Sequence, residues 1–136
     1  MASLTTSYFA VSKNKPGTKI SIARWNPPKI TGKIEIQTSF APSAELLRSY
    51  KDGKRSWFQY TQRYTAEQRT HFRENPEHFE DLLKRATIED IILLCYERYD
   101  GPETQCHRFL LYDMLQKIAN EWKYDVRFVD ETPPHK

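Results

Sequence analysis

Side chains that can do chemistry are grouped in a short part of the chain. Glu97 follows an apolar segment, and Cys106, His107 and Arg108 stand together nine residues later. A cysteine beside a histidine and an arginine is in surroundings that stabilise a thiolate, so Cys106 is a candidate nucleophile. Arg108 can bind a phosphate or carboxylate with its planar fork, and Glu97 can act as a general base. The group predicts a site that accepts an anion.

Each of these residues also has an ordinary structural explanation. Cys106 falls in line with Leu110 and Met114 on the predicted helix, and free cysteine is usually a small buried residue. Glu97 and Arg108 can bond each other and fix a loop, which is a common structural tie. Packing and chemistry therefore both remain open for this group.

Metal or redox chemistry is a further alternative. Cys95, Cys106 and His107 offer three ligands of the kind that catalytic zinc takes from a protein, and the two thiols can also form a disulfide. The chain has no CxxC pair and no HExxH motif, so its spacing matches no recognised metal motif. We assign no residue to a metal from the sequence, and no cofactor is identified.

A buried strand followed by a helix positions the reactive group. Residues 91–96 are apolar without alternation, which is typical of a central parallel strand covered on both faces. The residues Asp100-Gly101-Pro102 strongly favour a loop, and Thr104 is the predicted N-cap of a helix that runs to about Trp122. In open α/β sheets ligands bind at the carboxyl ends of the strands, and a helix N-terminus favours anions. Both expectations place the site in this turn.

The other elements complete a small α/β domain. Further strands are predicted over 4–10, 19–24 and 124–129, and the basic segment 29–40 is predicted to be a loop with a short extended piece at 34–37. Further helices are predicted over 42–50, 56–74 and 78–85. The pattern favours a single domain over residues 1–130, with a mostly parallel sheet and helices on both faces. Residues 131–136 are expected to form a flexible C-terminal tail.

Composition excludes several classes of protein. The 136 residues are 38% hydrophobic with a mean hydropathy of −0.78, and no apolar segment approaches the roughly 20 residues of a membrane helix. The N-terminus lacks the order of a secretory signal, so we expect a cytoplasmic location and reduced cysteines. No Walker loop, GxGxxG motif or nucleophile elbow is present, which argues against classical ATP, NAD and serine-hydrolase chemistry.

The positive charge is concentrated in the first half of the chain. Residues 1–65 hold 11 Lys and Arg against 3 Asp and Glu, a net charge of +8. Residues 66–136 hold 10 against 15, a net charge of −5. A basic half can attract a phosphate-containing ligand or a nucleic acid, although the two halves of one folded domain can also cancel.

Several motifs occur together in a recognisable order. Leu-Leu-Cys-Tyr-Glu at 93–97 and Cys-His-Arg at 106–108 are accompanied by Thr-Ser-Tyr-Phe at 6–9, Ile-Ser-Ile-Ala-Arg at 20–24, Ala-Pro-Ser at 41–43 and the pair Tyr60 and Tyr64. With these motifs the chain resembles the domain-of-unknown-function 488 family over most of its length. The resemblance implies a small Rossmann-like α/β domain of bacteria, archaea or phages whose activity is not settled.

The resemblance also implies ligand-binding residues outside the central group. It matches Tyr8, Arg24, Lys51 and Tyr64 as residues that line the crevice together with Arg108. Glu97, Cys106, His107 and Arg108 are then the candidate catalytic residues.

The leading hypothesis is a protein that acts on or binds a nucleotide or a nucleic-acid component in a polar, anion-accepting crevice. One alternative is a non-catalytic module that engages DNA or a protein partner, and a second is a cysteine-based metal or redox site. The sequence leaves open whether the protein is an enzyme, and it does not give the oligomeric state.

Overall fold

The computed structural model describes residues 2–12, 15–26, 34–101 and 103–132. Its strands are β1 (Ala2–Tyr8), β2 (Thr18–Ser21), β3 (Ile34–Ile36), β4 (Ile91–Cys95) and β5 (Val126–Phe128). Its α-helices are α1 (Phe9–Ser12), α2 (Ala44–Lys51), α3 (Trp57–Glu74), α4 (Pro76–Ala86) and α5 (His107–Trp122), and Thr38–Phe40 form a 3-10 helix. Residues 29–33 of the predicted basic loop lie outside the described residues.

The five strands form one sheet with β4 in the middle. The strand order is β3-β2-β4-β1-β5, and every neighbouring pair among the described strands is parallel. All five residues of β4 are buried, which explains why their apolar run has no alternation. The predicted α/β class is therefore confirmed, and the domain is a small Rossmann-like one.

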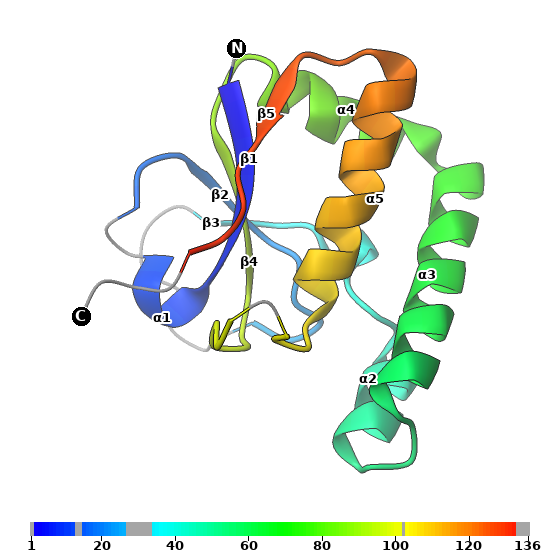
Figure 1. The fold of residues 1–136 in the computed structure, drawn as a ribbon. Helices are drawn as coiled ribbons and strands as arrows, with labels where there is room; N and C mark the ends of the chain where they lie inside the picture. Colours follow the sequence, from blue (N-terminus) through cyan, green and yellow to red (C-terminus); the bar gives the residue numbers. More distant parts are fainter. Residues whose placement is uncertain (1, 13–14, 27–33, 102, 133–136) are drawn as a thin grey trace.

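Helices cover the sheet on both sides, as predicted, but unequally (Figure 1). α4 packs against β1, and α5 packs against β1 and β4. α3 forms an outer layer that contacts α2, α4 and α5, while the short α1 lies on the other side of the sheet. The stripe that α5 buries contains Leu111, Leu115 and Ala119, at helical spacing. Among the described residues no helix is long and apolar enough to cross a membrane.

The start of α5 differs from the prediction. Thr104 does not cap this helix; its hydroxyl donates to the Gly101 carbonyl at 2.8 Å and accepts from the Asp100 amide at 2.8 Å. The loop uses this hydroxyl for its own turn, and the helix begins two residues later than such a cap would allow, with Cys106 in extended backbone as the N-cap. Cys106 therefore precedes the helix and does not share the stripe of Leu110 and Met114.

The predicted tail also begins too early. Glu131, which the sequence places in the flexible tail, is only 8% exposed and belongs to the folded domain. Its side chain is held by polar partners from β1 and α5, described below, so residues just after β5 are part of the structure. Residues 133–136 lie outside the described residues.

Candidate functional site

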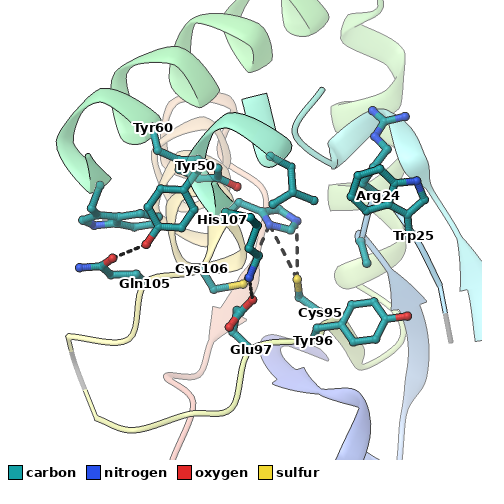
Figure 2. A pocket seen from close by; sticks show the side chains of 14 residues that line it. Arg24, Trp25, Tyr50, Tyr60, Cys95, Tyr96, Glu97, Gln105, Cys106 and His107 are labelled. Carbon is teal, nitrogen blue, oxygen red and sulfur yellow. Dashed lines mark hydrogen bonds and ion pairs between the residues drawn. The ribbon is translucent and has the colours of Figure 1, made fainter. Parts of the chain in front are cut away.

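A pocket opens at the edge of the sheet where β2 and β4 end (Figure 2). It has a volume of about 160 Å³. Its lining comes from the segment after β2, from α2 and α3, from the end of β4 and from the start of α5. These are carboxyl-terminal ends of parallel strands, where α/β proteins bind ligands. The reactive group predicted from the sequence therefore has a pocket beside it.

Aromatic side chains flank this pocket from two directions. Trp57 and Tyr60 of α3 lie nearly parallel, with ring centroids 5.1 Å apart and 17° between the planes. Tyr50 of α2 is tilted against Tyr60 at 4.8 Å. Trp25 and Tyr96 lie on the other side of the cysteine pair in Figure 2 and are 49% and 47% exposed. The pocket is therefore walled by aromatic rings, of which Trp25 and Tyr96 are well exposed.

Two thiols and an imidazole form the floor of the pocket. Cys95 is the last residue of β4, Cys106 is the N-cap of α5, and His107 is the first residue of that helix. His107 Nδ1 lies 3.7 Å from Cys95 Sγ and 4.0 Å from Cys106 Sγ. His107 Nε2 lies 2.7 Å from the carbonyl oxygen of Ile22. All three side chains are almost completely buried, and both cysteines are free thiols.

The two thiols are electrostatically unequal. Burial opposes ionisation of Cys106, but the hydrogen bond from Cys95, the contact with His107 and the positive charge of Arg108 lower its pKa well below the usual value. The hydrogen bond to Cys106, together with burial and the negative charge of Cys106, raises the pKa of Cys95 well above the usual value. The arrangement therefore favours one thiolate, at Cys106, with Cys95 as its proton-bearing partner.

An ion pair stands at the rim of the pocket. Lys51 Nζ of α2 lies 2.6 Å from Glu97 Oε1, and both side chains are partly exposed. Burial lowers the pKa of Lys51, but the hydrogen bond and charge of Glu97 outweigh it and raise the pKa overall. The hydroxyl of Tyr50 also donates to Gln105, which ties α2 to the loop before α5. Charged and polar groups therefore surround the mouth of an otherwise apolar pocket.

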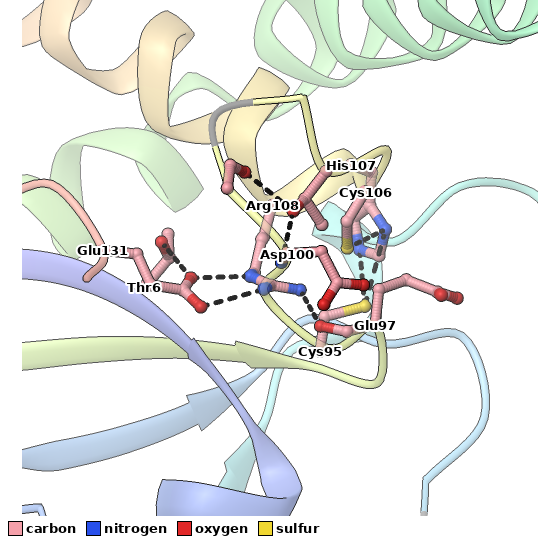
Figure 3. A network of polar contacts seen from close by, with 10 residues as sticks. Thr6, Cys95, Glu97, Asp100, Cys106, His107, Arg108 and Glu131 are labelled. Carbon is pink, nitrogen blue, oxygen red and sulfur yellow. Dashed lines mark hydrogen bonds and ion pairs between the residues drawn. The ribbon is translucent and has the colours of Figure 1, made fainter. Parts of the chain in front are cut away.

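Arg108 occupies a different place from the one predicted (Figure 3). Its Nε and one terminal nitrogen donate to the two carboxylate oxygens of Glu131 at 2.8 and 2.9 Å, and the other terminal nitrogen donates to the Glu97 carbonyl at 2.7 Å. Thr6 donates to the same carboxylate at 2.8 Å. The Arg108 side chain is 0% exposed, so its fork does not face a ligand.

The alternative of a Glu97–Arg108 side-chain pair is therefore wrong. Arg108 bonds the backbone of Glu97, whose carboxylate pairs with Lys51. Residue types alone cannot show this, because the carboxylate that neutralises Arg108 comes from Glu131, beyond β5. Arg108 thus positions the backbone that carries Glu97.

The residues implied by the family resemblance divide into two sets. Arg24 and Lys51 line the pocket, and Arg24 Nε donates to the Pro42 carbonyl at 2.9 Å. Tyr8 is 5% exposed and lies beside Arg108, with the guanidinium carbon 5.8 Å from its ring centre. Arg24 and Lys51 can contact a ligand at the rim, while Tyr8 packs beside the buried Arg108–Glu131 ion pair.

Tyr64 also lies behind the pocket. It is fully buried, and its hydroxyl donates to the Phe40 carbonyl at 2.7 Å. Its ring lies 5.4 Å from the ring of His107, centre to centre. Burial raises the pKa of Tyr64 well above the usual value, which keeps the hydroxyl protonated as a donor. Tyr64 therefore packs the imidazole from behind.

Sequence reasoning missed most of the aromatic lining and the partner of Arg108. Trp25, Trp57 and Tyr96 line the pocket but were not among the predicted site residues. Trp25 directly follows Arg24, and Tyr96 directly precedes Glu97. Aromatic residues next to candidate site residues were therefore the available signal. No sequence pattern indicated that Glu131 pairs with Arg108.

Comparisons with known proteins give a family and no activity. A family model described as the active DUF488-N3 subclade matches residues 4–119. The comparison with curated proteins and the comparison with solved structures gave no match. The matched region contains the pocket and both the Cys-Tyr-Glu and Cys-His-Arg motifs. The chain therefore belongs to the domain-of-unknown-function 488 family.

Proposed function

We propose that the protein binds, and acts on, a nucleotide or a nucleic-acid component whose base enters the pocket. The observation that carries this proposal is the pair of aromatic surfaces on either side of a reactive floor, at the carboxyl edge of a parallel sheet. Stacking of a base on an aromatic side chain contributes about 1–3 kcal/mol for any base, because every base has a π face.

Size restricts the class of ligand. The pocket volume of about 160 Å³ is below the ~300 Å³ at which typical small-molecule sites begin. A single ring system fits this space, whereas a whole dinucleotide does not. The sugar and phosphate of the ligand would then lie at the rim, which favours a mononucleotide or one unstacked base of a nucleic acid.

Charge at the rim supports a phosphate. Arg24 and Lys51 are the cations of the pocket lining, and Lys51 Nζ forms an ion pair with Glu97 Oε1 at 2.6 Å. A ligand phosphate would compete with Glu97 for the ammonium group, and it would release the carboxylate to accept a hydrogen bond or a proton. In this proposal Glu97 is the group placed to act on the bound ligand, and Cys106 lies on the floor of the pocket beneath it.

Tryptophan fluorescence offers a direct test, since Trp25 and Trp57 both line the pocket. Titration with a panel of nucleosides and nucleoside monophosphates is expected to change the emission in a saturable way. Trp57→Ala should weaken binding about tenfold or more, as loss of one stacking contact predicts. Phe58→Ala is the matched control, because Phe58 is the next residue of α3 and is 69% exposed.

Two results would count against the proposal. One is that no nucleoside, nucleotide or short oligonucleotide changes the emission or binds by calorimetry. The other is that Trp57→Ala and Phe58→Ala bind equally well. Binding of oligonucleotides alone, with a steep loss as salt rises, would instead favour a module that contacts the phosphate backbone of a nucleic acid.

A further inference from the structure

Three metal-ligating atoms converge at the floor of the pocket. They are the sulfurs of Cys95 and Cys106 and one ring nitrogen of His107, and they all lie within 4.8 Å of one another. Each comes from a well-fixed place: the end of β4, the N-cap of α5 and the first turn of α5. Their side chains are 5%, 3% and 4% exposed, so bulk water does not compete freely for them.

The imidazole is oriented as a metal ligand. His107 Nε2 lies 2.7 Å from the Ile22 carbonyl, and a carbonyl oxygen can only accept a hydrogen bond. Nε2 therefore carries the proton, which leaves the lone pair of neutral His107 on Nδ1, the ring nitrogen nearer to Cys95 Sγ and within 4.0 Å of Cys106 Sγ. Cys95 Sγ also lies 3.9 Å from Nε2, so the ring must turn for this lone pair to point at that sulfur. Histidines that bind metals characteristically donate their other ring N–H to a carbonyl or carboxylate in this manner.

The separations match a tetrahedral site. Zinc bonds of ~2.3 Å to sulfur and ~2.05 Å to nitrogen give nitrogen-to-sulfur edges of about 3.6 Å in a tetrahedron. The observed edges are 3.7 Å to Cys95 and 4.0 Å to Cys106. The two sulfurs lie within 4.8 Å of each other, and two zinc-bound sulfurs in a tetrahedron are about 3.8 Å apart, so side-chain shifts of up to about 1 Å bring all three atoms to bonding distance of one ion.

We propose that Cys95, Cys106 and His107 bind one thiophilic divalent ion, with zinc as the best fit. Metal binding releases to solvent the proton that Cys95 holds in the free chain, and two thiolates and a neutral imidazole then balance the double charge of zinc, so the buried centre becomes neutral. Sulfur ligands select zinc over magnesium or calcium, which prefer oxygen. The structure supplies the orienting carbonyl of Ile22 as well as the three ligands.

The fourth coordination position faces the pocket, because all three ligands line it. Three protein ligands with one open position are typical of catalytic zinc, whereas structural zinc has four protein ligands. The binding of the ion does not depend on the proposed function. The role of its open position does, since it rests on a nucleotide component entering the same pocket.

Metal titration under reducing conditions tests the site. The reduced, metal-free chain should bind one zinc ion, and cobalt(II) in its place should give the thiolate charge-transfer and tetrahedral ligand-field absorption bands. Cys95→Ser, Cys106→Ser and His107→Gln should each weaken zinc binding by about tenfold or more. His78→Gln is the matched control, since His78 lies on α4 in contact with His71 and away from the three ligands.

Alkylation of the wild-type thiols gives a second measurement, should a variant fail to fold. Zinc should protect Cys95 and Cys106 from alkylation, and magnesium should not. The proposal is overturned if the folded, reduced wild-type chain binds no zinc, if the cobalt complex lacks thiolate bands, or if zinc leaves alkylation unchanged. Recovery of a Cys95–Cys106 disulfide that reduction does not convert into a zinc-binding form overturns it as well.

The metal and nucleotide experiments fail independently. Zinc binding is measured without a nucleotide, and nucleotide titrations are run on both the metal-free and the zinc-loaded chain. Zinc binding without any nucleotide binding refutes only the proposed function. Nucleotide binding by a chain that binds no zinc refutes only the metal site.

Discussion

At the scale of single residues, the Arg108–Glu131 ion pair restricts which residues the two positions can hold, because each buried charge needs the other. Both side chains are fully buried, and the guanidinium bonds the carboxylate through two nitrogens. Replacing a buried pair with apolar groups is often neutral, but removing one partner leaves an uncompensated buried charge. The stability of the fold therefore depends strongly on Glu131, which lies 23 residues after Arg108 in the chain.

Glu131→Ala is expected to lower the free energy of unfolding by about 3–5 kcal/mol, because Arg108 would remain buried without its counterion. Urea denaturation followed by circular dichroism measures this loss. Glu89→Ala is the control: it removes an exposed pair with Arg85 and should cost about 1 kcal/mol or less. Equal losses in the two variants would show that Arg108 is not held by Glu131.

At the scale of elements, the junction of α2 and α3 holds one wall of the pocket. Ser43 caps α2 by accepting from the Leu46 amide, and Glu67 of α3 accepts from the Ser43 amide at 2.9 Å and from its hydroxyl. The same residue therefore starts one helix and ties it to the other. The wall that carries Tyr50 and Trp57 depends on this connection.

Ser43→Ala should lower the free energy of unfolding by about 1–2 kcal/mol, because it removes a helix cap. It should also weaken ligand binding, since the hydroxyl link to Glu67 is lost and the aromatic wall loosens. Ser56→Ala is the matched variant: it removes the corresponding cap of α3 and leaves Glu67 untouched. Similar stability with weaker binding only in Ser43→Ala is the expected outcome, measured by urea unfolding and fluorescence titration.

The elements near the site were predictable where the sequence pattern was strong. The apolar run of β4 and the stripe of α5 identified a buried strand followed by a helix, and the parallel sheet follows from that arrangement. The first turn of α5 was not predictable, because threonine is a favoured N-cap residue and Cys106 makes no side-chain capping bond. The Thr104 hydroxyl is used by the preceding turn instead. A local competition between two hydrogen bonds decided where Cys106 lies.

The site was predictable only in part, for a physical reason. Cys106, His107 and Glu97 are close in sequence to one strand end, so their grouping followed from the strand. The aromatic wall depends on how α2 and α3 pack beside that strand end, and the role of Glu131 depends on a contact with Arg108 across 23 positions. Neither of these long-range contacts leaves a periodic pattern in the sequence.

At the scale of the whole molecule, a pair of histidines outside the pocket couples stability to pH. His71 Nε2 lies 2.7 Å from His78 Nδ1, between α3 and α4, and its other nitrogen contacts Gln68 at 3.0 Å. Burial lowers the pKa of His71 below its ordinary value of 6.5, and the charge of His78 lowers it further, while Glu77 and Glu74 oppose this. The folded protein therefore holds His71 neutral more strongly than the unfolded chain does.

The free energy of unfolding should consequently rise with pH as His71 loses its proton. Just below pH 6.5 the unfolded chain binds more protons at this position than the folded chain does. The contribution of neutral His71 to the free energy of unfolding is therefore fully present above that pH and decreases on acidification. Urea unfolding at about pH 7 and about pH 5.5 measures the change, above the range in which carboxylates titrate. His71→Gln should reduce the difference between the two conditions; an unchanged difference would assign it to other groups.

The strand order has a consequence for how the protein is made. β1 is synthesised early, yet its two neighbours in the sheet are β4 and β5, at residues 91–95 and 126–128. The carboxylate that neutralises Arg108 arrives later still, at Glu131. A nascent chain on the ribosome therefore cannot complete the sheet or bury that arginine until almost all of these residues have emerged, and long-range parallel pairing is slow. We expect the domain to fold as one unit after residue 131 is released, with β1 exposed to chaperones until then.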